Sequence, residues 1–150
     1  MHNLLRNVKV TNTSQIGGST AVAYSSILDM RGYDGVAFIA MISGGPSTSA
    51  FGIKVQEASS SSMSTGSDVA DLTGTSVTAS STTIADGFLA ADIFRPNKQY
   101  VRMAMIPSAG SDTLSAIVAL QYKAGDSPVT HSTGKNLGTE YFVSPSTGTA

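Results

Sequence analysis

The chain has 150 residues, the size of one domain, and a chain of this length can bury a sizeable core without disulfides or metals. It contains no cysteine, which excludes disulfides, thiolate metal sites and cysteine nucleophiles. Only 13% of its residues are charged and the net charge is -1, so nucleic-acid binding is not expected. A surface rich in Ser, Thr, Gly and Ala is easier to desolvate against another protein than one covered with Lys and Glu, so the composition favours assembly.

A membrane partner is not expected either. The longest apolar stretch, Val36–Ile42, is too short to span a bilayer. The segment Met1–Arg6 is not followed by the apolar core of a secretory signal. We therefore expect the chain to be made and kept in a cytoplasm.

Short strand signals, separated by Gly, Ser, Asp and Pro, dominate the first part of the chain. Alternation predicts a strand over Asn7–Thr11, and Ser14–Thr20, with its paired glycines, is predicted to be a loop. β-formers continue over Ala21–Met30, and Arg31–Gly35 predicts a tight connection. The run Val36–Ile42 is apolar on both faces, so we expect a central strand that is covered on both sides.

The clearest alternation follows in the next predicted strand. One face should point into the core and the other toward water: the first carries Phe51, Ile53 and Val55, and the second Gly52, Lys54 and Gln56. A Ser-rich loop is predicted over Ala58–Ser67. Asp68–Leu72 is predicted to be either one helical turn or an edge segment.

Three more strands are predicted before Lys123. Phe88–Phe94 should end at a turn over Arg95–Lys98, which contains a Pro-Asn pair. Tyr100–Ile106 and Leu114–Tyr122 are predicted to be the arms of a hairpin. In the second arm one face is lined by Leu114, Ala116, Val118, Leu120 and Tyr122. In all, about eight short antiparallel strands predict an all-β fold: a β-sandwich, a jelly roll or a barrel, extended by a C-terminal arm.

The composition changes after Lys123. Residues 124–150 are mostly Gly, Ser, Thr and Pro, and they cannot build a core alone. We therefore expect a β-sandwich domain over residues 1–123 and an extended or flexible arm over residues 124–150. The arm either stays disordered or orders when its apolar residues dock onto its own domain or a neighbour. These residues are Leu137, Tyr141, Phe142 and Val143.

No arrangement of side chains predicts catalysis, and we expect neither an enzyme nor a cofactor. His2 and His131 lie in the parts with the least predicted structure, where nothing fixes the geometry of a base or a metal ligand. Glu57 and Asp92 are the only carboxylates on predicted strands that could face each other as a glycosidase requires, and solvated strand positions suit both equally well.

The other charged residues have structural interpretations. Asp68 and Asp71 lack the ligand spacing of a helix-loop-helix calcium site, so a bare loop is expected. Arg95, Lys98 and Arg102 form the only basic cluster. An ion-pairing strand edge that discourages aggregation is favoured there over a nucleic-acid patch.

Three segments carry a recognisable order of motifs. In Gly32–Ile39 a Tyr-Asp pair precedes a predicted central strand. In Phe51–Ala58 a strand that contains Lys-Val-Gln-Glu precedes a Ser-rich loop. In Arg95–Arg102 a turn precedes a strand that begins with Tyr-Val-Arg. Together they resemble small β-sandwich virion proteins of tailed bacteriophages, the head decoration or cement proteins. The resemblance covers roughly Leu28–Lys123. The chain departs from that family in lacking an aromatic residue in the Ser-rich loop and in its longer C-terminal extension.

The resemblance implies a structural protein on the outer head surface of a virion, made in the cytoplasm of a bacterial host. It would bind and stabilise the major capsid protein shell, as a homodimer or homotrimer, and its extended termini would reach across subunit boundaries. The partner-binding residues expected there are Leu4, Leu5, Leu137, Tyr141, Phe142 and Val143.

Two alternative functions stay open. One is a phage tail or adsorption component. The other is a carbohydrate-binding β-sandwich module, for which a chain with no Trp and 5 Tyr offers few aromatic platforms.

Overall fold

The computed structural model describes residues 4–19, 22–44, 51–63, 68–72, 74, 76–79, 87–106 and 112–131. In chain order their elements are α1 (Leu4–Asn7), β1 (Lys9–Ser19), β2 (Ala23–Tyr24), β3 (Leu28–Asp29), β4 (Tyr33–Gly44), β5 (Phe51–Ala58), β6 (Ala70–Asp71), β7 (Val77–Ala79), β8 (Gly87–Phe94), β9 (Tyr100–Ile106) and β10 (Asp112–Ala124).

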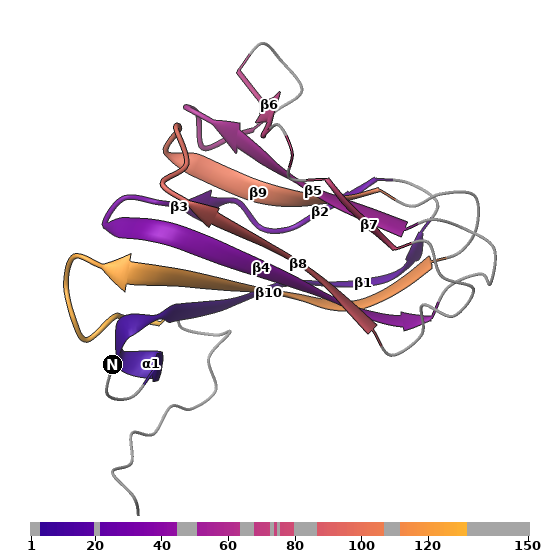
Figure 1. Cartoon of the computed structure of the whole chain (residues 1–150), viewed down its shortest axis with the longest axis horizontal. Helices are drawn as coiled ribbons and strands as arrows, with labels where there is room; N and C mark the ends of the chain where they lie inside the picture. Colours follow the sequence, from indigo (N-terminus) through magenta and orange to yellow (C-terminus); the bar gives the residue numbers. More distant parts are fainter. Residues whose placement is uncertain are drawn as a thin grey trace, which may run out of the picture.

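The strands form two antiparallel sheets that pack face to face (Figure 1). Sheet A has the order β1-β10-β4-β8. Sheet B has the order β2-β9-β5-β6, with β3 also paired to β9 and β7 also paired to β5. The described strands thus fill eight positions, because β2 and β3 share one edge and β6 and β7 share the other. This is the strand order of a jelly roll, and the predicted all-β sandwich is confirmed.

The core fills the space between the two sheets. β4 contributes alternate side chains from Val36 to Ile42, including Phe38, which is fully buried. Sheet B contributes Ile53 and Val55 from β5, together with residues of β9. Several of these are methionines, whose unbranched side chains fill irregular gaps between layers. The remaining buried members on β9 and β10 are Val101, Met103, Met105, Ile117 and Ala119.

The alternation predicted for β5 is confirmed for the side chains that the structure describes. Ile53 and Val55 are fully buried, and Lys54 and Gln56 are half-buried on the opposite face. The segment Asp68–Leu72 forms an edge, since it contains β6, which pairs with the end of β5.

One strand prediction is wrong in extent and another in the burial of one face. The loop predicted over Ser14–Thr20 belongs to β1 as far as Ser19, because register shifts after Asn12 let the glycine-containing stretch stay paired with β10. β4 is a central strand as predicted, between β10 and β8, but only its inner face is in the core. On its outer face Ala37 and Ile39 are half-buried and Met41 is exposed.

The predicted hairpin of β9 and β10 is also wrong. Both strands exist, but β9 lies in sheet B beside β5, and β10 lies in sheet A between β1 and β4. The connection crosses from one sheet to the other. Each strand has one face on the shared core, so the apolar pattern of the sequence is the same for both arrangements.

Residues 124–131 of the predicted arm contact the connection between β3 and β4 and then the start of the chain. The Gly125 N–H donates to the Gly32 carbonyl at 2.9 Å, and the Val129 N–H donates to the Arg6 carbonyl at 2.9 Å. The Val129 side chain is buried. The described part of the domain therefore continues to His131, and the rest of the predicted arm, residues 132–150, lies outside the described residues.

Phe38→Ala should lower the free energy of unfolding by about 3 to 5 kcal/mol, because it empties a fully buried position between the sheets. Met41→Ala is the matched control: it lies on the same strand but on the outer face, where it is 48% exposed, and should cost less than about 1.5 kcal/mol. Urea unfolding measures both. Equal losses would contradict the assignment of inner and outer faces.

Candidate functional site: the outer face of sheet A

The most apolar exposed surface of the described chain is the outer face of sheet A. Its register is set by β4, where Ile39 lies opposite Val118 of β10 and opposite Ala90 of β8. Residues opposite one another in an antiparallel pair share a face. Following the same register, this face comprises Val10, Asn12, Gly35, Ala37, Ile39, Met41, Phe88, Ala90, Asp92, Phe94, Ala116, Val118, Leu120 and Tyr122.

The large apolar side chains on this face are open to water. Met41 is 48% exposed, Phe88 68% and Phe94 51%. Ile39 and Val118, at the middle of the sheet, are half-buried by their neighbours. The exposure of the outer residues on both β4 and β8 shows that this face is open to water. A contiguous apolar face of this kind marks a contact with another protein or with another part of the chain.

Its single charged residue is held by a hydrogen bond within the face. The Tyr122 hydroxyl donates to Asp92 Oδ1 at 2.6 Å. The tyrosine ring lies directly over Gly35, since a Cβ at that position would overlap it. Burial and the neighbouring Asp92 carboxylate raise the pKa of Tyr122 to about 12, so the hydroxyl stays a donor at neutral pH.

Positive charges gather at the same end of the face. Arg95 Cζ lies 5.1 Å from the centroid of the Phe94 ring, and Lys123 Nζ lies 4.7 Å from it. Both cations are thus placed beside an exposed aromatic ring and close to Tyr122 and Asp92 in the strand register. The end of the face formed by the last residues of β8 and β10 therefore carries both signs of charge, and the rest of the face is apolar except for Asn12.

The outer face of sheet B is different in character. Lys54 Nζ and Asp71 Oδ2 form an ion pair at 2.6 Å, and Gln56 Nε2 donates to Asp71 Oδ1 at 2.7 Å. Arg102 Nε donates to Gln56 Oε1 at 2.9 Å, and its guanidinium lies 3.9 Å from the centroid of the Tyr24 ring. These polar groups bind one another within the chain, so the outer face of sheet B lacks the apolar character of the outer face of sheet A.

Glu57 and Asp92 do not form a catalytic pair. Glu57 is buried, and its Oε2 accepts hydrogen bonds from the N–H groups of Asn97 at 2.9 Å and Lys98 at 3.2 Å. It therefore stabilises the turn before β9. Asp92 lies on the outer face of the other sheet, so the two carboxylates share no cleft.

Asp68 and Asp71 bind separate partners. Asp68 Oδ2 accepts the N–H groups of Ser59 and Ser60, and its Oδ1 lies 3.1 Å from Lys98 Nζ. The hydrogen bond from Lys98 is the main reason that the pKa of Asp68 is lowered, and the hydrogen bond from Lys54 does the same for the pKa of Asp71. Within the described residues no three His, Asp or Glu side chains are grouped to hold a metal ion.

The predicted basic cluster is not assembled on one strand edge. Arg95 lies at the end of sheet A, Lys98 is paired with Asp68, and Arg102 lies on the outer face of sheet B. Arg102 also belongs to β9, which has a neighbouring strand on both sides and is therefore not an edge strand. In the parts of the chain with an assigned structure, no helix is long and apolar enough to cross a bilayer.

A second exposed apolar feature lies at the start of the chain. Leu4 and Leu5, both predicted to bind a partner, are 53% and 37% exposed on α1. The ring of His131 joins this helix to β1, since its Nδ1 accepts the Val10 N–H at 3.4 Å and its Nε2 lies 3.0 Å from the Leu5 carbonyl oxygen. We call α1 together with residues 127–131 the α1 corner. The other predicted site residues, Leu137, Tyr141, Phe142 and Val143, lie outside the described residues, as does His2.

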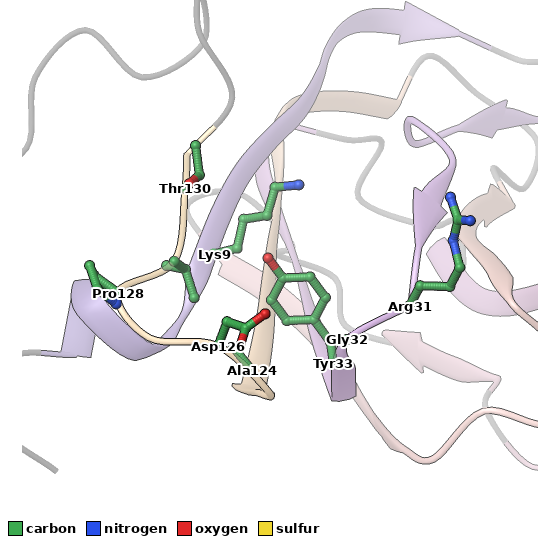
Figure 2. A pocket seen from close by; sticks show the side chains of 9 residues that line it. Lys9, Arg31, Gly32, Tyr33, Ala124, Asp126, Pro128 and Thr130 are labelled. Atoms are coloured by element: carbon green, nitrogen blue, oxygen red, sulfur yellow. The ribbon is translucent and has the colours of Figure 1, made fainter.

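A small polar pocket lies beside the α1 corner (Figure 2). It has a volume of about 320 Å³, and Lys9, Tyr33 and Asp126 are among the residues that line it. Lys9 Nζ is 5.9 Å from the centroid of the Tyr33 ring, and partial burial raises the pKa of Tyr33. Arg31, at the rim, forms an ion pair with Asp29 at 2.7 Å.

Gly35→Ala should lower the free energy of unfolding by about 1 to 3 kcal/mol, because the added methyl group displaces the Tyr122 ring and breaks its hydrogen bond to Asp92. In a Tyr122→Ala background the same substitution should cost much less, since the obstructing ring is absent. A double-mutant cycle from denaturant unfolding measures the difference. An equal cost in both backgrounds would rule out the contact between ring and glycine.

The ion pairs of Asp68 and Asp71 predict a loss of stability in acid. Because the folded-state pKa of each carboxyl group is lowered, its stabilising contribution is present above the ordinary value of 3.8 and is lost as the pH falls through the lowered value. The double variant Asp68→Asn/Asp71→Asn should therefore lose less stability below about pH 4 than the unaltered protein. Thermal unfolding as a function of pH checks this.

Removal of the two lysines provides the control. Lys54→Met/Lys98→Met should flatten the same part of the pH curve, since it removes the main cause of both lowered pKa values. Curves that run parallel to that of the unaltered protein would contradict the role of these pairs.

No family model matches the chain, and no curated protein matches it. A function is therefore proposed from the fold, from its surfaces and from the resemblance of its motifs.

Proposed function

We propose that this chain is a structural protein of a virion, a decoration protein that binds and stabilises the major capsid protein shell of a tailed phage. The observation that carries the proposal is the outer face of sheet A, an apolar surface that spans four strands. A surface of that kind suits a flat contact with protein, whereas small molecules bind in concave sites.

The fold supports the proposal by analogy. Jelly rolls are common in viral capsid proteins, and they also occur in lectins and cupins. The three segments that resemble decoration proteins include most of β4 and β5 and the turn that leads into β9. These strands have neighbours on both sides and carry much of the core, so the resemblance concerns the centre of the fold.

A protein that joins subunits of a shell needs more than one contact surface, and the described chain has two. The outer face of sheet A is one. The α1 corner is the other, with Leu4 and Leu5 exposed beside the ends of β1 and β10. Neither surface carries a dense set of charges, so the free-energy cost of removing water is small when protein covers either of them.

The polar pocket favours carbohydrate binding as a second candidate function. Tyr33 supplies an aromatic ring, and Lys9 and Asp126 supply polar groups near it, as sugar sites require. In a virion this site would suit adsorption to a host surface. A glycan array would test it: binding that Tyr33→Ala abolishes would support this candidate, and no binding to any glycan would remove it.

The decoration function predicts saturable binding to capsids that lack this protein. The double variant Leu4→Asp/Leu5→Asp should bind at least about tenfold more weakly, because it places charges on the exposed apolar side chains of α1. Cosedimentation with purified expanded capsids measures the affinity, and cryo-electron microscopy locates the density.

Thr78→Lys, an exposed position on the outer face of sheet B, is the matched control and should bind normally. If the unaltered protein does not sediment with capsids at any concentration, the proposed function is wrong.

A further inference from the structure

The free edge of β8, the side of that strand away from β4, differs from the other sheet edges that the structure describes (Figure 1). β8 pairs with β4 over eight residues in a continuous register. At the opposite edge of sheet A the register of β1 shifts repeatedly, and both edges of sheet B consist of strands of two or three residues. Bulges and short strands keep an edge from pairing with another chain, and β8 has neither.

Side chains also cover part of the edge of β1. His131 Nδ1 accepts the Val10 N–H at 3.4 Å, and the Ser26 hydroxyl donates to the Thr13 carbonyl at 2.8 Å. β7 comes near β8, but it pairs with β5. As far as the described residues show, sheet A therefore has one protected edge and one edge that is open to a further strand.

The backbone of β8 presents its hydrogen-bonding groups to this edge at alternate residues. The Arg95 N–H donates at 2.7 Å to the carbonyl of Asp34, which follows the register of β8 and β4. Hydrogen-bonded and non-hydrogen-bonded pairs alternate along an antiparallel ladder. The groups directed toward β4 therefore belong to Leu89, Ala91 and Ile93, and those directed away from it to Phe88, Ala90, Asp92 and Phe94. Within the described chain the backbone of the second set has no hydrogen-bond partner.

The side chains of this second set do not repel a partner strand. Phe88 and Phe94 are largely exposed, and Ala90 is small. The one charged member, Asp92, is held from across the sheet by the Tyr122 hydroxyl, which reaches it from β10 over the intervening strand β4. The edge thus combines unpaired backbone groups with exposed apolar side chains, and both are features that strand addition uses.

Two cations at the end of β8 indicate the charge of the partner. Arg95 and Lys123 both lie beside the exposed ring of Phe94. Neither of them forms an ion pair with a carboxylate of the described residues. A segment that covers Phe94 also approaches these two cations, so a carboxylate at that end of the segment gives electrostatic complementarity.

We propose that the free edge of β8 binds an extended segment of the capsid protein, which becomes a fifth strand of sheet A. Apolar side chains at alternate positions of that segment continue the outer face of sheet A, and an acidic residue lies beside Phe94. This inference rests on the proposed function, because it specifies which part of the capsid protein binds next to the surface that carries that proposal.

The variant Ala90→Pro tests the inference. Proline removes an N–H that points away from β4, so it blocks a partner strand without breaking a hydrogen bond inside the sheet. Cosedimentation with expanded capsids should show binding at least about tenfold weaker than that of the unaltered protein. Ala90→Ser is the matched control, because it keeps the N–H and should bind normally. Circular dichroism and thermal unfolding verify that both variants are folded.

Hydrogen exchange of the unaltered protein gives a second measurement that needs no variant. When the protein binds capsids, the N–H groups of Ala90, Asp92 and Phe94 should exchange at least about tenfold more slowly. Those of Ala91 and Ile93 are bonded to β4 and should be slow before and after binding. Exchange that is quenched and then read by NMR in a denaturing solvent resolves these positions.

The charge of the segment is tested separately. Binding should weaken as the salt concentration rises, and Arg95→Gln/Lys123→Gln should make it less dependent on salt. An equal dependence in both proteins would contradict an acidic residue beside Phe94.

The possible failures are distinguishable. If folded Ala90→Pro binds capsids as well as Ala90→Ser and the edge amides are not slowed, the inference is wrong and the proposed function stands. If the unaltered protein does not bind capsids at all, the proposed function fails and the inference fails with it. If Ala90→Pro instead dissociates an oligomer whose edge amides are already slow without capsids, a second copy occupies the edge and the inference is overturned.

Discussion

The burial of the inner face of β4 is the constraint on which the rest of the structure depends. Phe38 and its neighbours on this face lie between β10 and β8 and pack against the methionines and valines of sheet B. That packing fixes the register of β4, and the register in turn places Ile39 and Met41 on the opposite side. The apolar outer face is therefore a consequence of the same strand alternation that builds the core. A shift of one residue would exchange the two surfaces.

Much of the fold could be predicted because most strands follow a simple rule. In β5 the alternation of Ile53 and Val55 with Lys54 and Gln56 identifies both the strand and its buried face. The partners of each strand could not be predicted in this way. β9 and β10 are consecutive strands and each has one face on the core, yet they lie in different sheets, since pairing is decided by how all strands share one core.

The candidate site could be predicted only in part. Leu4 and Leu5, predicted to bind a partner, are exposed, and their role in binding stays a prediction. The sequence does not single out Ile39, because a strand that is apolar on both faces has the pattern of a fully covered strand. The sequence records that a side chain is apolar but not which element, if any, covers it. Only the order of the strands in the sheet separates the apolar side chains that face the core from those that face outward.

The position of β10 has a consequence for how the chain folds. In sheet A the last described strand, β10, lies between β1 and β4, so neither of these two early strands has this hydrogen-bonded neighbour until residues near the end of the domain are available. Pairing between residues more than 90 positions apart carries a large loop-closure cost, which slows folding. During synthesis β4 must therefore wait with one edge unpaired and with apolar side chains on both faces. Exposed apolar surface and an unpaired strand edge favour aggregation, so the nascent chain is most exposed to it before β10 is available.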